Sequence, residues 1–284
     1  MTIAVSVKIN DGVVLATDSA STVTGTTPDG VVGNVINVYN NANKVFNLLK
    51  GCRIGAVTWG AGAIGNASTS SLVKDFRKLL KDGDEKWKLN TENYTIQDVA
   101  IRLRKFIYED NYIKAFEAFP PDKKPPLGFI VAGYSANAPL ADEYVIEIKL
   151  GNCAPPRALR GSGESGIFWA GMGEPLNRLV LGFGTALPQV LQQNLGVPPS
   201  QIPAAMHVLQ QTLGVPLAIA GMPLQDAIDL AEFLADVAAK YSRFAPGAPM
   251  VGGPIEIAAI SKHEGFKWVK RKFYFDQKLT PMEP

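Results

Sequence analysis

The chain has 284 residues, of which 46% are hydrophobic and 19% charged, and its formal net charge is +2. This near balance gives no electrostatic reason to expect nucleic acid or an anionic membrane surface as a partner. A chain of this length can bury a core without disulfides or a structural metal, and its two cysteines, Cys52 and Cys153, exclude a disulfide scaffold. No secretory signal is visible, and no apolar run reaches the roughly 18 to 20 residues that span a bilayer. We therefore expect a cytoplasmic protein.

Hairpins are predicted at the start of the chain. Branched residues alternate over 2–9, the tripeptide Asn10-Asp11-Gly12 gives a tight-turn signal, and an apolar run resumes over 13–17. The segment 19–43, which is rich in Thr, Gly and Asn, is expected to form a long loop. A second hairpin is predicted over 45–59.

Helices and strands then occur in groups. Thr95 is expected to cap a helix over 96–116, and the prolines of 120–126 end it. The other predicted elements are helices at 67–81, 174–182, 201–213 and 224–241 and strands at 127–134, 144–150, 254–260 and 266–269. Because strands and helices cluster instead of alternating, the order favours an α+β domain with antiparallel sheets. We predict one domain over 1–284, with a helical insertion at 182–223 and a C-terminal tail at 271–284.

Several familiar kinds of site are excluded or disfavoured. The two histidines, His207 and His263, lie in no zinc-binding spacing, and we expect both to be structural or surface residues. The segment Gly161–Gly166 matches the dinucleotide fingerprint, but it lies past the middle of the chain and has no acidic residue 20 positions on, so we interpret it as a loop. No P-loop is present, so any ATP-dependent unfolding would come from a separate ATPase. We expect chemistry without metal or organic cofactor.

The second residue, Thr2, offers a way to do this chemistry without histidine. Methionine before a small residue is commonly excised, and excision would leave Thr2 with a free α-amine beside its own hydroxyl. An α-amine with a pKa of about 7.7 to 8 can act as base for that hydroxyl at neutral pH. The first hairpin brings Asp18 back beside Thr2, and Lys44 begins the second hairpin. An ammonium group there would lower the pKa of the α-amine, and Asp18 would hold it in place.

These residues carry a family resemblance. The segments Thr2–Val5, Asp11–Ser19, Asn43–Val45 and Gly55–Gly62 resemble the N-terminal half of proteasome β-type subunits, which are N-terminal-nucleophile hydrolases, and most of all the bacterial members. The resemblance implies a four-layer α-β-β-α sandwich with two antiparallel sheets and threonine-type endopeptidase chemistry. It implies that Thr2 is the nucleophile and that Asp18 and Lys44 are the charge pair. It further implies an oxyanion-binding N–H at Gly60, a backbone at Thr22 that holds the peptide as an added strand, and Ser21 at the border of the specificity pocket.

The sequence also departs from that family's pattern. The 19–43 loop is longer than usual. A Gly-Ser-Gly motif is replaced by Gly171-Met172-Gly173, although Gly161-Ser162-Gly163 could supply Ser162 instead. A late acidic residue and serine are replaced by Ala248 and Val251.

The expected function is hydrolysis of a peptide or an unfolded protein inside a homo-oligomeric stacked double ring of hexameric or heptameric rings. The ring is implied by the resemblance, and apolar residues beyond one stripe of the first two helices, such as Val73, Ile101, Tyr108 and Tyr112, favour an interface there. An inactive ring subunit and another amide hydrolase with the same nucleophile remain alternatives.

Overall fold

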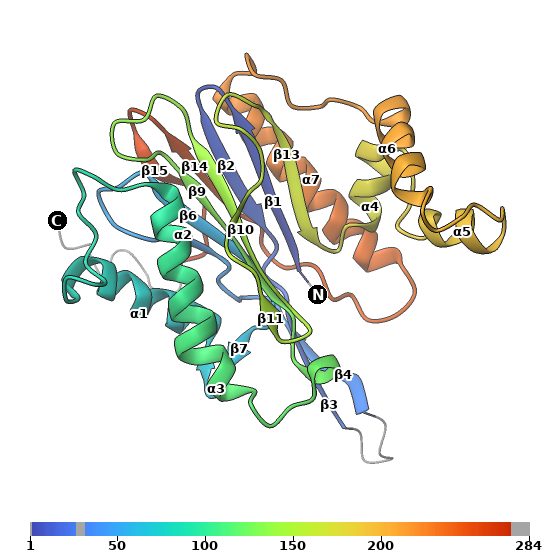
Figure 1. Ribbon diagram of the computed structural model, residues 1–284, viewed down its shortest axis with the longest axis horizontal. Coiled ribbons are helices and arrows are strands. Elements are labelled where there is room, and N and C mark those ends of the chain that lie inside the picture. The colour runs from blue at the N-terminus through green and yellow to red at the C-terminus, as the bar shows by residue number, and fades with distance from the viewer. Residues whose placement is uncertain (1, 27–31, 274–284) are drawn as a thin grey trace.

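A computed structural model describes residues 2–26 and 32–273 of the chain (Figure 1). Met1 and most of the expected tail, residues 274–284, lie outside the described residues. Within these limits the chain forms a mixed α+β structure whose sheets are antiparallel.

The first sheet contains the N-terminal hairpin. Its strands follow in the order β13 (Gly166–Gly171), β1 (Ile3–Ile9), β2 (Gly12–Thr17), β14 (Glu256–Ser261) and β15 (Gly265–Lys270). Every residue of β1 and β2 is buried, because both faces of this sheet are covered. The odd-numbered residues of β1 pack in an apolar cluster with the long helix α7 (Leu224–Phe244), whereas Ala4 packs against the second sheet.

The second sheet faces the first across a shared apolar cluster. Its strands follow in the order β11 (Asn152–Cys153), β10 (Asp142–Lys149), β9 (Leu127–Gly133), β6 (Ile54–Gly60) and β5 (Val45–Asn47), and β12 (Arg157–Ala158) also pairs with β10. Val57 and Ile130 from this sheet meet Val13 and Leu15 of β2. The sheets are therefore joined by side-chain packing between their facing surfaces.

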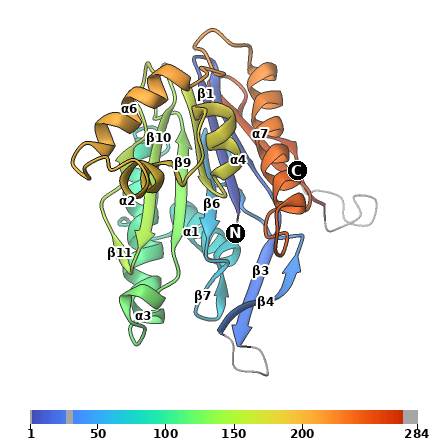
Figure 2. The ribbon, with the colours of Figure 1, turned by 90° about the vertical axis from the view of Figure 1, so that its right-hand side faces the viewer.

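Helices cover the outer faces of both sheets (Figure 2). The helix α1 (Thr69–Asp82) and the helix α2 (Ile96–Arg104) pack on the second sheet, and each begins at a side-chain cap, Ser68 for α1 and Thr95 for α2. The remaining helical segments are η1 (Lys105–Tyr112), α3 (Ile113–Ala115), η2 (Pro121–Lys123), α4 (Glu174–Leu176), η3 (Asn177–Leu181), α5 (Leu187–Gln193) and α6 (Ile202–Leu213).

The structure differs from the sequence-based prediction at the segment 19–43. Instead of one loop, the chain forms a hairpin of β3 (Ser21–Thr26) and β4 (Val32–Tyr39), which projects from the body of the molecule (Figure 1). Thr recurs at every second position of β3 and Val at every third position of β4, but the Gly and Asn residues among them conceal these strands. A short pair, β7 (Ala63–Ile64) with β8 (Ala67–Ser68), also precedes α1.

The strand β13 and the helical segment after Thr95 also differ from the sequence-based prediction. The strand β13 lies between the predicted loop that ends at Gly166 and the helix predicted from Glu174, in a segment with no predicted element, and it forms the edge of the first sheet beside β1. The helix predicted over 96–116 is α-helical to Arg104, continues with π-type bonding over η1 and ends with one α-helical turn, α3. The sequence predicts an interface at Val73, Ile101, Tyr108 and Tyr112. Val73 and Tyr112 are core residues, whereas Ile101 is 47% exposed and is the most exposed of the four.

The segment between η3 and α7 carries the helices α5 and α6, neither of which contains a buried residue. No Asp, Glu, Lys or Arg occurs between Arg178 and Asp226. Its exposed side chains include Val190, Leu195, Val208 and Ile219. This segment is thus the uncharged and partly apolar side of the molecule, visible to the right in Figure 1.

Candidate active site at the start of the first strand

Thr2 lies just before β1, and the neighbouring strand holds its backbone. Its carbonyl oxygen accepts a hydrogen bond of 2.8 Å from the N–H of Met172. Gly171, with φ of +92°, passes so close that a Cβ there would lie 1.8 Å from the same oxygen. Only glycine fits this approach, and the end of β13 therefore fixes the position of Thr2.

Asp18 follows β2 and is fully buried beside Thr2, as the hairpin geometry predicts. Its Oδ1 accepts a hydrogen bond of 3.1 Å from the N–H of Ile3. Its Oδ2 accepts from the N–H groups of Ala20, at 3.0 Å, and Gly252, at 3.1 Å. Backbone donors from three separate segments thus hold the carboxylate in one orientation.

Lys44 completes the cluster from the residue before β5. Its Nζ lies 2.8 Å from Thr2 Oγ1 and 2.8 Å from Asp18 Oδ1, and all three residues are at most 6% exposed. Burial lowers the pKa of Lys44 below its ordinary value, and the carboxylate of Asp18 opposes that shift. The sequence predicts that Lys44 acts on the α-amine, whereas the structure shows it in direct contact with the hydroxyl.

A cavity of about 540 Å³ opens beside this cluster. Thr2 and Lys44 line it, and so do Ser21, Thr22 and Gly60, which are also predicted site residues. The remaining lining residues are Ala20, Tyr39, Asn40, Asn41, Ala42, Asn43, Thr58, Trp59, Ala61, Gly62, Ser68, Thr69 and Ser70. The walls therefore combine neutral polar and apolar groups, and Lys44 is the one charged residue among them.

Gly60 ends β6 at this cavity with φ of +93°. A Cβ there would lie 2.3 Å from the carbonyl oxygen of Pro126, so the position requires glycine. The next N–H, that of Ala61, is already bonded to the Pro126 oxygen at 2.9 Å. Thr58, Trp59 and Gly60 are the residues of β6 that line this cavity.

Several residues considered in the sequence lie elsewhere. Gly166 pairs with Lys8 and Gly171 pairs with Ile3, so Ser162, which precedes Gly166, lies toward the opposite end of β1 from Thr2 and cannot supply the missing serine. Met172 contributes its backbone, and its side chain packs in the α7 cluster. Val251 is buried next to Gly252, which bonds Asp18, whereas Ala248 is exposed.

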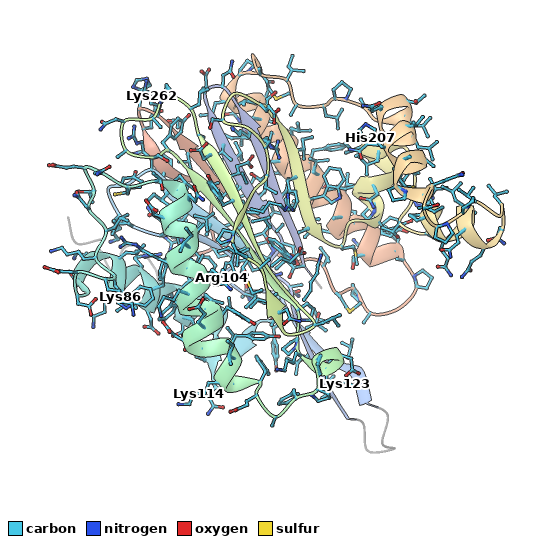
Figure 3. All side chains as sticks on the ribbon, in the orientation of Figure 1. Lys86, Arg104, Lys114, Lys123, His207 and Lys262 are labelled. Carbon is cyan, nitrogen blue, oxygen red and sulfur yellow. The ribbon has the colours of Figure 1, made fainter. Side chains whose placement is uncertain are left out.

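Both histidines are exposed. His207 lies on α6, on the uncharged side of the molecule (Figure 3). Among the described residues, no group of three or more His, Cys, Asp or Glu side chains is placed to bind a metal ion. In the same part of the chain, no helix is both long and apolar enough to cross a membrane.

Sequence reasoning missed the groups that hold the site together. Four of them are backbone N–H groups, at Ile3, Ala20, Met172 and Gly252, which no residue pattern can reveal. Lys272 and Glu256 form a further buried ion pair next to Ser19, and their positions far along the chain gave no signal of this contact.

Known proteins share this fold, although no protein-family model matches the chain and no curated protein matches its sequence. Anbu (ancestral beta-subunit) from Yersinia bercovieri aligns with a TM-score of 0.50 at 13% identity, over 95% of this chain and 88% of that chain. A Gly-1 mutant of Anbu from Hyphomicrobium sp. strain MC1 aligns with a TM-score of 0.52 at 15% identity, over 98% of this chain and 92% of that chain. The chain is similar in fold to Anbu.

The expected bacterial proteasome β-type subunit is therefore wrong as a family assignment, because these structural neighbours are Anbu proteins, a proteasome-like but distinct family. The segments that carry the resemblance are the first hairpin, the residues Asn43–Val45 at the start of β5 and the strand that ends at Gly60. They belong to the frame of the fold, so they cannot separate one family with this frame from another. At 13% and 15% identity the likeness extends to the fold alone.

Proposed function

We propose that this chain is an N-terminal-nucleophile hydrolase in which Thr2, once Met1 has been removed, cleaves peptide bonds as a threonine-type endopeptidase. The observation that carries the proposal is the contact of Lys44 Nζ with both Thr2 Oγ1 and Asp18 Oδ1, each at 2.8 Å, beside a cavity that Thr2 and Lys44 line. A buried hydroxyl that touches a lysine and opens to a cavity is placed for nucleophilic attack.

In the proposed reaction, Thr2 Oγ1 bonds to the carbonyl carbon of the peptide while its proton passes to the α-amine of Thr2. Lys44 stabilises the developing alkoxide and lowers the pKa of that amine, and Asp18 holds Lys44. The N–H of Gly60 binds the oxyanion. The C–N bond then breaks as the leaving amine takes up the proton, and water hydrolyses the remaining ester. Ser21 and Thr22 line the substrate side, with the backbone of Thr22 pairing with the peptide.

The architecture and the assembly form part of the same proposal. We assign a four-layer α-β-β-α arrangement in one domain, with the segment 182–223 as an insertion and 271–284 as a tail. The helices on both outer faces and the apolar cluster between the sheets support this assignment. A homo-oligomeric stacked double ring in the cytoplasm, of hexameric or heptameric rings, would hide the nucleophile from folded proteins, and a separate ATPase would deliver unfolded substrate. The exposed apolar residues of α5 and α6 support an oligomer.

The test has two stages. Intact mass spectrometry first establishes whether Met1 is absent, since a retained Met1 blocks the amine. The protein is then treated with a peptide epoxyketone, which reacts with the amine and the hydroxyl of an N-terminal threonine. We expect a cyclic adduct on Thr2 and loss of both adduct and peptide hydrolysis in Thr2→Ala. Thr212→Ala is the control, because the Thr212 hydroxyl donates to the carbonyl oxygen of Val208 within α6 and Thr212 does not line the cavity. Unchanged hydrolysis by Thr2→Ala would refute the mechanism.

A second candidate is an inactive subunit of the same fold. It is favoured by Met172 and Val251, which stand where auxiliary serines are expected and which pack as apolar residues. Under this alternative the epoxyketone forms no adduct even on a chain that lacks Met1. Another amide hydrolase with the same nucleophile would form the adduct but would not cleave peptides.

A further inference from the structure

A second buried ion pair lies directly behind the candidate site. Lys272 follows β15, and its Nζ lies 3.0 Å from Oε2 of Glu256, the first residue of β14. The two side chains are only 7% and 2% exposed. Most other ion pairs in the described residues lie at the surface, where charged side chains are in contact with solvent. The burial of Lys272 with Glu256 therefore indicates a role inside the structure.

The contacts of Lys272 converge on the segments that carry the site. Its Nζ donates hydrogen bonds to Ser19 Oγ and, at 2.7 Å, to the carbonyl oxygen of Ala42. Ser19 directly follows Asp18, and the N–H of Ala42, close to Lys44 in sequence, donates to the Ser19 carbonyl at 2.9 Å. One ammonium group therefore joins the segment of Asp18, the segment of Lys44 and the start of β14.

The charges form a linked set as well. Lys44 is paired with Asp18, and Lys272 is paired with Glu256. The charge of Lys272 acts to lower the pKa of Lys44, and the charge of Glu256 acts to raise it. Losing one member of the second pair would leave its partner buried and uncompensated within reach of Lys44.

We propose that Lys272 and Glu256 are positioning residues for the Thr2–Lys44–Asp18 site: by joining Ser19, Ala42 and β14, they set the placement and the charge environment of Lys44. This inference rests on the proposed hydrolase function for its effect on rate, but not for its effect on Lys44 itself. Neither residue lines the cavity, so neither is expected to touch substrate.

The experiment compares Lys272→Met, Glu256→Gln and the double variant. The double variant replaces the ion pair by neutral side chains of similar length, which avoids an unpaired buried charge if a single variant fails to fold. Lys270→Met is the matched control, because Lys270 lies two residues away and forms an ion pair with Glu232 at the surface. Peptide hydrolysis is measured across pH. In parallel, each lysine is titrated by competitive labelling with acetic anhydride and peptide mass spectrometry.

We expect Lys272→Met to lower kcat about 10- to 100-fold with little change in KM for a short peptide, since small displacements of reacting groups have effects of this size. The labelling midpoint of Lys44 should move to higher pH in Lys272→Met and to lower pH in Glu256→Gln. It should lie near the wild-type value in the double variant and be unmoved in Lys270→Met. A purely structural pair would lower thermal stability alone and leave the Lys44 midpoint and the pH profile unchanged, which would overturn the inference.

The two possible failures can be separated. If the wild-type chain lacks peptidase activity, the labelling of Lys44 still tests the positioning inference. If Thr2 reacts and hydrolyses peptides but Lys44 responds equally in all four variants, the hydrolase proposal stands and the positioning inference fails.

Discussion

Two similar polar clusters lie along the strand β1, one just before its start and one at its middle. At one end Thr2 meets Asp18 and Lys44. Farther along, Ser6 donates to the buried Glu143, which also pairs with Arg160 at 3.0 Å. Each cluster combines a hydroxyl, a carboxylate and a cation, so residue types alone do not distinguish them.

The surroundings of the two clusters differ. Thr2 lines a cavity, and the carboxylate of Asp18 in this cluster is held by backbone N–H groups as well as by Lys44. Ser6 lies between the sheets with no exposed surface, and burial raises the pKa of Glu143, whereas Arg160 and Ser6 act to lower it. The comparison teaches that access to a cavity turns such a cluster into a candidate site, and that without access it is a buried network that specifies packing.

The largest expected effect is on peptide hydrolysis, and it should distinguish Lys44 of the first cluster from Arg160 of the second. Lys44→Met should lower kcat/KM about 100-fold or more, because it removes the group that contacts the nucleophile. Lys44→Met should lower the free energy of unfolding less than Arg160→Met does, since Asp18 keeps the hydrogen bonds from its backbone donors. Peptide hydrolysis and urea denaturation of the same samples check both points. Near-normal turnover by Lys44→Met would remove the distinction between the clusters.

Arg160→Met should act in the opposite way, on stability and not on the rate per folded molecule. Breaking a buried pair costs about 3 to 5 kcal/mol of unfolding free energy. In the folded protein the pKa of Glu143 is raised above its unfolded value, and loss of Arg160 raises it further. Below the unfolded pKa Glu143 is protonated in both states, so the destabilisation by Arg160→Met should be small there. It should grow as pH rises through the pKa that Glu143 has in the folded protein. Urea denaturation between acidic and neutral pH measures this; a loss that is constant across pH would contradict it.

Ser6→Ala should cost about 1 to 3 kcal/mol, because Glu143 Oε1 loses a buried donor, with activity retained. The parallel change Thr2→Ala should abolish activity. If Ser6→Ala also abolished hydrolysis at full folding, the second cluster would be coupled to the chemistry and the contrast would be lost.

The smallest effect is expected for Ser162→Ala. Ser162 donates to Asp142 Oδ1 at 2.7 Å in an exposed turn, so its loss should change stability by about 0.5 kcal/mol or less and leave hydrolysis unaffected. A marked loss of activity would mean that Ser162 reaches the site after all, against the register of β13 with β1.

Much of the frame could be predicted from the sequence, for reasons that the structure makes clear. The alternation of β1, the turn after Ile9 and the cap at Thr95 are local signals, and each forms as expected. The same hairpin brought Asp18 to Thr2. The strand β13 could not be found in this way, since Gly166–Gly171 is recognisable as a strand only beside β1.

The limits of prediction at the site have a similar origin. Met172 and Gly252 act through backbone N–H groups, and Lys272 acts over a separation that only the folded chain closes. The family assignment failed because its motifs describe the frame of the fold, which the Anbu structures share.

The pairing order of the first sheet also has a consequence for biosynthesis. Its first hairpin is local, but Ile3 pairs with Gly171, and Thr17 pairs with Glu256. A nascent chain that emerges from the ribosome therefore has Thr2 and Asp18 long before it has Met172, Gly252 or Lys272. Since such distant pairings form late, Thr2 and Asp18 remain without the other groups of the site until nearly the whole chain has been made. The topology itself thus delays the completion of the site until the surrounding fold exists to enclose it.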